Sequence, residues 1–157
     1  MPRQHTSHII IHCSATRPSQ DIDAKEIDRW HRARGFLEIG YHFVIKRDGT
    51  IEEGRTIQET GAHAKKYNHK SIGICLVGGV TEDYIKIPEN NFLEPQWKSL
   101  KEVLSNLKLM FPDAITIGHN QVSEKACPSF DVQEWLKEND FDYCKCKDPD
   151  CNCKEND

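Results

Sequence analysis

Apolar residues along this chain fall into two patterns, short continuous runs and longer stretches with helical spacing. Five short runs are rich in β-branched or aromatic residues, and they lie at residues 8–12, 41–46, 50–53, 72–77 and 115–118. Runs of this length are typical of strands, and nearly continuous runs are typical of buried ones. Asp48-Gly49 joins the second run to the third and favours a hairpin turn. The pattern therefore predicts about five strands.

Three stretches have the spacing and the end residues of helices: residues 24–34 after Asp23, residues 95–110 from Pro95, and a closing helix after Asp131. Asp23 and Glu26 match a capping box, and Gly35 is suited to end the first helix. Pro95 suits the first turn of the second helix, and Asp131 can cap the third. Strands and helices alternate. The sequence therefore predicts a single α/β domain with a mixed central sheet of about five strands and helices on both faces.

Composition fits one globular domain. Hydrophobic residues make up 37% and charged residues 29% of the 157 positions, as in ordinary folded proteins. No apolar run approaches the ~20 residues of a membrane span, and the segment before His8 lacks the apolar core of a signal peptide. The net charge of −4 argues against general attraction to nucleic acid. We expect a cytoplasmic monomer with its domain at residues 1–141, no membrane span and no direct nucleic-acid partner.

Two histidines and a cysteine follow predicted strands at positions suited to metal binding. His12 closes the first apolar run, His119 closes the last, and Cys127 follows within a short loop. Side chains at strand ends lie at the rim of a sheet, where clefts form in α/β folds. Zinc held by three protein ligands keeps a fourth position for water, which is typical of a catalytic site. A histidine at a strand end is more often a rim or capping residue, so spacing alone leaves both interpretations open.

Four ordered motifs carry a resemblance to a known family. They are residues 12–16 (HCSAT), 40–50 (GYHFVIKRDGT), 63–73 (HAKKYNHKSIG) and 125–131 (KACPSFD). Together they closely resemble the type 2 zinc N-acetylmuramoyl-L-alanine amidases, above all the amidase-type lysozymes of T-seven-like phages, with peptidoglycan recognition proteins as more distant cousins. The resemblance covers about residues 8–135, and four motifs in matching order are far more specific than one.

The resemblance implies roles for individual residues. His12, His119 and Cys127 would hold one catalytic Zn²⁺, and Tyr41 and Lys125 would complete the catalytic machinery. A phenol at Tyr41 can hydrogen-bond the reacting water or the oxyanion, and Lys125 can present a positive charge to it. Without the resemblance, a packed aromatic residue and a solvated lysine are the commoner interpretations.

Weaker expectations concern other histidines and cysteines. His63 lies in the segment that lines the family's cleft, and we predict a substrate-binding or transition-state role for its imidazole. Strand alternation puts His42 on the opposite face from Tyr41, so we expect His42 in the core or behind the site. Cys13 alternates away from His12 along the first strand and Cys75 lies in the middle of the strand at residues 72–77, so both are expected to be buried.

The implied activity is hydrolysis of the amide between the lactyl group of N-acetylmuramic acid and L-alanine in peptidoglycan, by a phage endolysin that lyses its host. Such a protein would be made in the host cytoplasm and would reach the periplasmic cell wall with help from another lysis protein. Two alternatives stay open: a peptidoglycan-binding module that does not cut, and a dual-function protein that also binds and inhibits a phage RNA polymerase. The presence of Cys127 favours the hydrolase, because the cousins that only bind lack this cysteine.

The C-terminal segment, residues 142–157, departs from the phage pattern. Two Cys-x-Cys pairs bracket an Asp-Pro turn, at Cys144, Cys146, Cys151 and Cys153. Four thiolates can hold a closed structural zinc, although zinc fingers prefer wider spacing within each pair. A charged tail without metal is the alternative, and disulfides are not expected in the cytosol. The segment is therefore a candidate second zinc site.

Overall fold

The computed structural model describes residues 2–143. The candidate second zinc site at Cys144, Cys146, Cys151 and Cys153 lies outside the described residues. Within residues 2–143, no helix has both the length and the apolar character needed to cross a membrane.

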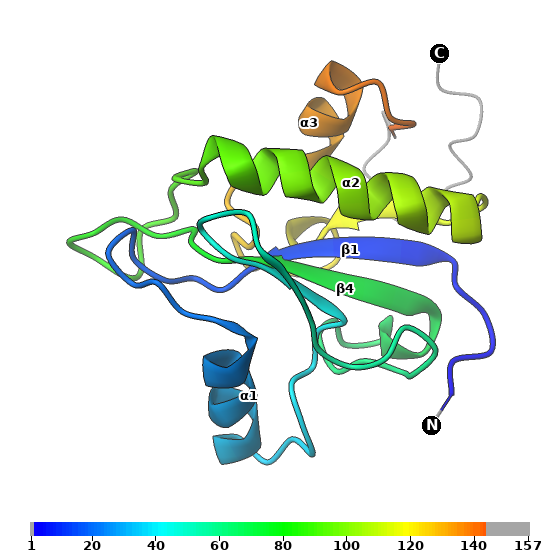
Figure 1. Cartoon of the computed structure of the whole chain (residues 1–157), viewed down its shortest axis with the longest axis horizontal. Helices are drawn as coiled ribbons and strands as arrows, with labels where there is room; N and C mark the ends of the chain where they lie inside the picture. The colour runs from blue at the N-terminus through cyan, green and yellow to red at the C-terminus, as the bar shows by residue number, and fades with distance from the viewer. Residues whose placement is uncertain (1, 144–157) are drawn as a thin grey trace.

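A mixed five-stranded sheet forms the centre of the molecule (Figure 1). Its strands are β1 (His8–Cys13), β2 (Phe43–Ile45), β3 (Ile51–Glu53), β4 (Ser71–Leu76) and β5 (Ile115–Gly118), in the order β3-β2-β4-β1-β5. β1 runs parallel to β4 and β5, β2 runs parallel to β4, and β3 is antiparallel to β2 across the hairpin. Every residue of β1 and β4 is buried, as expected for central strands covered on both faces. The predicted α/β class and mixed sheet are confirmed.

Three α-helices cover the two faces of this sheet. Figure 1 shows α1 (Ala24–Ala33) below the sheet, and α2 (Glu94–Met110) and α3 (Val132–Glu138) above it. The larger core lies between the sheet and the upper helices, where α2 contributes Leu100, Val103, Leu104 and Leu107. Ile27 of α1 packs into a smaller core on the other face, with Val44 and Cys75. Two short 3-10 turns complete the fold, η1 (Asn68–Lys70) and η2 (His119–Gln121). Helices on both faces are therefore confirmed.

The helix ends agree with the predicted caps, with small differences. Asp23 accepts a hydrogen bond from the Glu26 N–H at 2.9 Å, and Gly35 follows α1 with a φ of 100°. The Glu26 carboxylate pairs with Arg29 on the helix surface, so the reciprocal half of the predicted capping box does not form. α2 begins at Glu94, one residue before Pro95, which still occupies its first turn. These differences leave the fold unchanged.

The start of β2 also differs from the prediction. The regular strand begins at Phe43 rather than at Tyr41. The Tyr41 ring instead packs against the rings of His12 and His31, with centroids 5.0 and 5.4 Å away. Tyr41 therefore lies at the end of β1, where the functional residues gather.

Candidate metal centre and active site

Two neighbouring parallel strands bring a pair of histidines to one edge of the sheet. His12 is the penultimate residue of β1 and is only 1% exposed, and His119 is the first residue after β5. β1 and β5 pair directly, so their carboxyl ends meet. Cys127 reaches the same place from the loop that follows η2. The metal-binding atoms of these three residues all lie within 4.8 Å of one another. The structure thus brings together the three residues predicted to hold zinc.

The geometry and chemistry of this cluster fit a zinc ion. Tetrahedral zinc, with bonds of about 2.0–2.3 Å, keeps its ligand atoms roughly 3.5 Å apart. Cys127 Sγ lies 3.8 Å from His12 Nδ1, so small side-chain shifts would complete such a site. Two imidazoles and one thiolate are donors that zinc prefers. It is the one cluster of three metal-ligating side chains within residues 2–143.

The protonation of the two histidines favours metal binding. Burial is the main reason that the pKa of His12 lies well below its ordinary value. Burial, and then the positive charge of Lys125, lower the pKa of His119 to about 4. Both rings are therefore neutral at neutral pH, which is the form that binds a metal.

The Cys127 thiol is harder to ionise than an ordinary cysteine. Its hydrogen bond with Cys13 and its burial raise the pKa of the Cys127 thiol well above the ordinary range. The backbone N–H of Cys13 donates to Cys127 Sγ at 3.2 Å, so the backbone offers a donor to the sulfur. A bound metal would favour the thiolate, and binding would then release a proton.

Tyr41 and Lys125 lie beside this cluster. The Tyr41 ring centroid is 5.0 Å from that of His12, and burial raises the pKa of the phenol well above its ordinary value. Tyr41 therefore keeps its proton and can donate a hydrogen bond. Lys125 is exposed and lines the same cleft as His119, and its charge contributes to the lowered pKa of both His12 and His119. A hydrogen-bond donor and a positive charge thus lie next to the candidate metal centre.

A cleft of about 530 Å³ opens at the cluster. Its walls come from the ends of β1 and β5, from α1, and from the loops at residues 61–68 and 125–127. Sequence reasoning named Tyr41, His63 and Lys125 among its lining but missed Arg34 and Lys65. The signal for Arg34 was its place at the end of α1, where its guanidinium lies 5.2 Å from the ring centroid of Phe36. Lys65 lies within the motif at residues 63–73, but the motif alone does not indicate which of its residues face the cleft.

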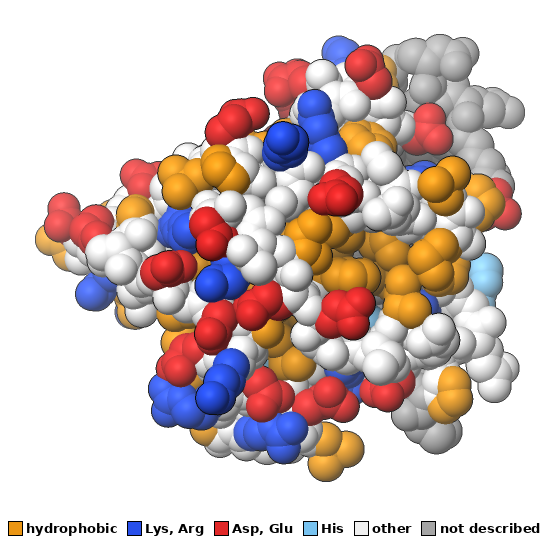
Figure 2. Space-filling model, in the orientation of Figure 1, with side chains coloured by type: hydrophobic (Ala, Val, Ile, Leu, Met, Phe, Trp, Pro, Cys, Tyr) orange, Lys and Arg blue, Asp and Glu red, His pale blue; other side chains and the backbone are white. Residues whose placement is uncertain are grey.

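The charge of the cleft differs from that of the molecular face shown in Figure 2. On the face shown in Figure 2, acidic and basic side chains are mixed. The residues that line the cleft include Arg34, Lys65 and Lys125 and no aspartate or glutamate. A protein with a net charge of −4 therefore presents a basic cleft. Such a cleft favours a substrate with carboxylates.

Two further histidines near the centre, His42 and His63, lie behind the cleft surface or at its wall. His42 is buried, accepts the Gly73 N–H at Nδ1 and contacts the Glu59 carbonyl through Nε2 at 2.8 Å. Burial lowers the pKa of His42 to about 4, so it is a neutral core residue. His63 lines the cleft, but its Nδ1 lies 2.8 Å from His12 Nε2. His63 therefore contacts a candidate metal ligand directly, a relation that no spacing in the sequence indicated.

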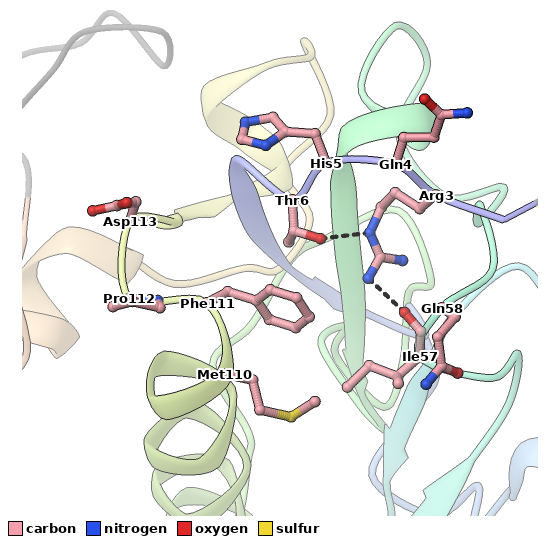
Figure 3. Close-up of a pocket in the computed structure, with 10 residues that line it drawn as sticks. All are labelled: Arg3, Gln4, His5, Thr6, Ile57, Gln58, Met110, Phe111, Pro112 and Asp113. Atoms are coloured by element: carbon pink, nitrogen blue, oxygen red, sulfur yellow. Dashed lines mark hydrogen bonds between the residues drawn. The ribbon is translucent and has the colours of Figure 1, made fainter.

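A second pocket, of about 500 Å³, lies at the other end of β1 and offers no comparable chemistry (Figure 3). It is formed by the segment before β1, the loop at Ile57 and Gln58, and the end of α2. The Arg3 guanidinium donates to Thr6 Oγ1 and to the carbonyls of Ile57 and Glu59, so its hydrogen bonds stay within the protein. The pocket holds no cluster of three metal-ligating side chains among the described residues. The candidate active site is therefore the cleft at the carboxyl end of β1.

Comparison with known proteins agrees with this geometry. The protein family described as N-acetylmuramoyl-L-alanine amidase matches residues 2–130. The endolysin of Escherichia phage T7 is 48% identical over 139 residues, which cover 88% of this chain and 91% of that protein. Among solved structures, N-acetylmuramoyl-L-alanine amidase LysC from Clostridium intestinale has a TM-score of 0.73 at 27% identity, covering 87% of each chain. A variant of Drosophila PGRP-LB in complex with tracheal cytotoxin has a TM-score of 0.70 at 27% identity, covering 87% of this chain and 83% of that one. This chain belongs to the N-acetylmuramoyl-L-alanine amidase family.

Proposed function

We propose that this protein is a phage endolysin that uses zinc to hydrolyse the amide bond between N-acetylmuramic acid and L-alanine in peptidoglycan. The observation that carries the proposal is the cluster of His12, His119 and Cys127 next to a cleft that Tyr41 and Lys125 line. Membership of the amidase family and the likeness to phage endolysins support the same activity.

The side chains of the cleft have distinct tasks in this reaction. When bound, zinc supplies Lewis acidity, which lowers the pKa of a water toward ~7 and polarises the substrate carbonyl. His12 and His119 are neutral and offer lone pairs, and Cys127 offers a thiolate once its proton has left. Tyr41 keeps its proton and donates a hydrogen bond to the carbonyl oxygen as negative charge develops there. Lys125 stabilises the same charge with its ammonium group.

The basic lining of the cleft suits the proposed substrate. The stem peptide of peptidoglycan carries free carboxylates close to the scissile amide. Arg34, Lys65 and Lys125 line the cleft without a carboxylate among them, so the cleft would attract such a peptide. The wall as a whole is anionic and so is the protein, so recognition rests on the shape and charge of this cleft rather than on net charge.

Metal removal tests the proposal directly. The purified protein should carry one zinc in residues 2–143, and chelation should abolish the hydrolysis of purified cell walls, with recovery when zinc is returned. Truncation before Cys144 separates this zinc from any metal in the tail. Full hydrolysis by a verified metal-free protein would exclude the zinc mechanism.

Cys127→Ser separates catalysis from binding. A serine hydroxyl is a far poorer zinc ligand than a thiolate, so the variant should lose the metal or hold it without activating water. Muropeptide binding should survive, because the cleft walls do not depend on that sulfur. Undiminished hydrolysis would remove Cys127 from the zinc site, whereas muropeptide binding without hydrolysis by wild type would favour a module that does not cut. Inhibition of a phage RNA polymerase stays a prediction, and a transcription assay on the same variant checks whether it is independent of zinc.

A further inference from the structure

The hydrogen bonds that hold His12 extend away from the metal cluster to a second histidine. His12 Nε2 lies 2.8 Å from His63 Nδ1, while His12 Nδ1 lies 3.8 Å from Cys127 Sγ. His63 Nε2 lies 3.2 Å from Ser71 Oγ. The Ser71 hydroxyl donates to the Tyr67 carbonyl at 2.7 Å. These groups form one continuous series of hydrogen bonds, from the Tyr67 backbone carbonyl to the candidate metal ligand His12.

The Tyr67 carbonyl determines which group donates in each hydrogen bond of this series. A carbonyl only accepts, so the single hydroxyl hydrogen of Ser71 is used on Tyr67. Ser71 can then only accept from His63, which puts the hydrogen of the neutral His63 ring on Nε2 and makes Nδ1 an acceptor. His12 must therefore donate from Nε2. Its Nδ1 then carries no hydrogen, and the lone pair of this nitrogen lies on the side of Cys127 Sγ.

The surrounding backbone holds the His63 ring in this place. The N–H groups of His63 and Ala64 both donate to Asn68 Oδ1, at 2.7 and 2.9 Å. The ring packs over β4 at Gly73, where a Cβ would come within 2.7 Å of His63 Cγ. A Cβ at Gly61 would lie 2.7 Å from His63 Cδ2. Two glycines and one asparagine therefore shape a close-fitting seat for this ring.

We propose that His63 is a positioning residue for the metal: it accepts the His12 Nε2–H and so presents His12 Nδ1 to zinc. The inference rests on the proposed zinc function. Metal-binding histidines commonly use their other nitrogen in this way, and loss of the partner typically costs about 10- to 100-fold in metal affinity. Both nitrogens of His63 are engaged inside the protein. We therefore assign His63 to the support of His12 rather than to direct hydrogen bonding with substrate.

Zinc affinity of the full-length protein tests this role without any assay of turnover. Zinc dissociation is measured by competition with a chromogenic chelator in His63→Ala, His63→Gln and His69→Ala, the last a control at an exposed histidine. His63→Ala should bind zinc about 10- to 100-fold more weakly than wild type. His63→Gln should stay within about threefold, because its amide oxygen accepts from His12 while its amide nitrogen donates to Ser71. His69→Ala should match wild type.

The tautomer of His12 is a second and independent readout. Long-range proton–nitrogen NMR of the metal-free protein should show the hydrogen of both His12 and His63 on Nε2. Ser71→Ala removes the acceptor that orients His63, so the His12 ring should then populate both tautomers. This measurement remains available even where His63→Ala does not fold, because wild type and Ser71→Ala keep the imidazole.

The outcomes separate this inference from the proposed function. Tight zinc binding by wild type with equal affinity in His63→Ala would overturn the positioning role alone. Equal weakening in His63→Ala and His63→Gln would also overturn it, since packing of the ring rather than its hydrogen bond would then matter. An Nδ1–H tautomer at His12 in the metal-free protein would do the same. Wild type that binds no zinc at residues 2–143 would instead refute the zinc mechanism itself.

Discussion

Tyr41 and Lys125 differ from the three metal-binding residues in what their removal should change. Neither side chain belongs to the cluster of His12, His119 and Cys127. Both line the cleft beside it. Their contribution therefore belongs to turnover, and it can be separated from metal binding and from folding.

We predict that Tyr41→Phe and Lys125→Ala keep the fold and the zinc but lose most of the hydrolytic rate. Removing one preorganised group that stabilises the oxyanion typically lowers kcat by about 10²–10³-fold. The measurement is kcat on soluble muropeptides beside zinc content for each variant. Tyr84→Phe and Lys101→Ala are controls at exposed positions away from the cleft. Near-wild-type kcat in Tyr41→Phe or Lys125→Ala, with unchanged zinc, would show that the residue concerned has no part in the reaction.

The sequence motifs identify the residues of the metal cluster but not the residues that hold them in place. His12 and His119 were predictable because each directly follows an apolar run, and strand ends meet at one edge of a parallel sheet. The contact between His63 and His12 joins residues 51 positions apart through an irregular loop. The path of an irregular loop leaves no periodic pattern in the sequence. The contact between His12 and His63 can therefore be identified only from the three-dimensional structure. The same holds for Arg34 at the cleft wall.

Among the secondary-structure elements, β4 determines the position of the His63 ring, because the ring packs directly over Gly73 of this strand. A Cβ at this position would lie 2.7–2.8 Å from three atoms of the His63 ring. We predict that Gly73→Ala displaces the ring, lowers the free energy of unfolding and weakens zinc binding. The same substitution in a His63→Ala background should cost far less, because the ring that it meets is gone. Chemical denaturation of the four proteins gives the coupling energy. Additive effects of the two substitutions would contradict this account of the seat.

His42, which directly precedes β2, makes the stability of the sheet depend on pH. Burial lowers its pKa to about 4, whereas in the unfolded chain it titrates at its ordinary value of about 6.5. Between these values the unfolded state binds more protons, so stability is full above pH 6.5 and falls as the pH drops toward 4. We predict that His42→Gln removes this contribution, so that the stability difference between wild type and variant shrinks by about 2 kcal/mol from pH 7 to pH 5. Urea unfolding of the metal-free proteins measures it. Histidines that do not contact His42 cancel between the two proteins, so a difference independent of pH would show that folding does not shift the pKa of His42.

The elements themselves were largely predictable, and the exceptions have local causes. β1 and β4 are buried on both faces and therefore appear in the sequence as continuous apolar runs. The Asp23 cap was predictable because its hydrogen bond joins residues only three positions apart, Asp23 and Glu26. The β-rich neighbours of Tyr41 predict that it belongs to β2, but its ring packs against His12 outside the strand. Tertiary contacts at the site thus override local preference where the function lies.

The protein as a whole is acidic, but its cleft is basic. Substrate binding should therefore depend on the charge of the residues in the cleft and on the salt concentration. We predict that Arg34→Glu raises the KM for a muropeptide with free carboxylates by roughly tenfold at low ionic strength, because the reversed charge repels the substrate. The effect should shrink above about 0.15 M salt, where charges more than about 8 Å apart are screened. kcat should change little, since Arg34 lies at the cleft wall rather than in the metal cluster. Arg32→Glu is the matched control: it changes the net charge by the same amount on α1, outside the cleft, and breaks only a surface pair with Asp28. An equal rise in KM for both variants would assign the effect to net charge, and the cleft would then have no selective role in recognition.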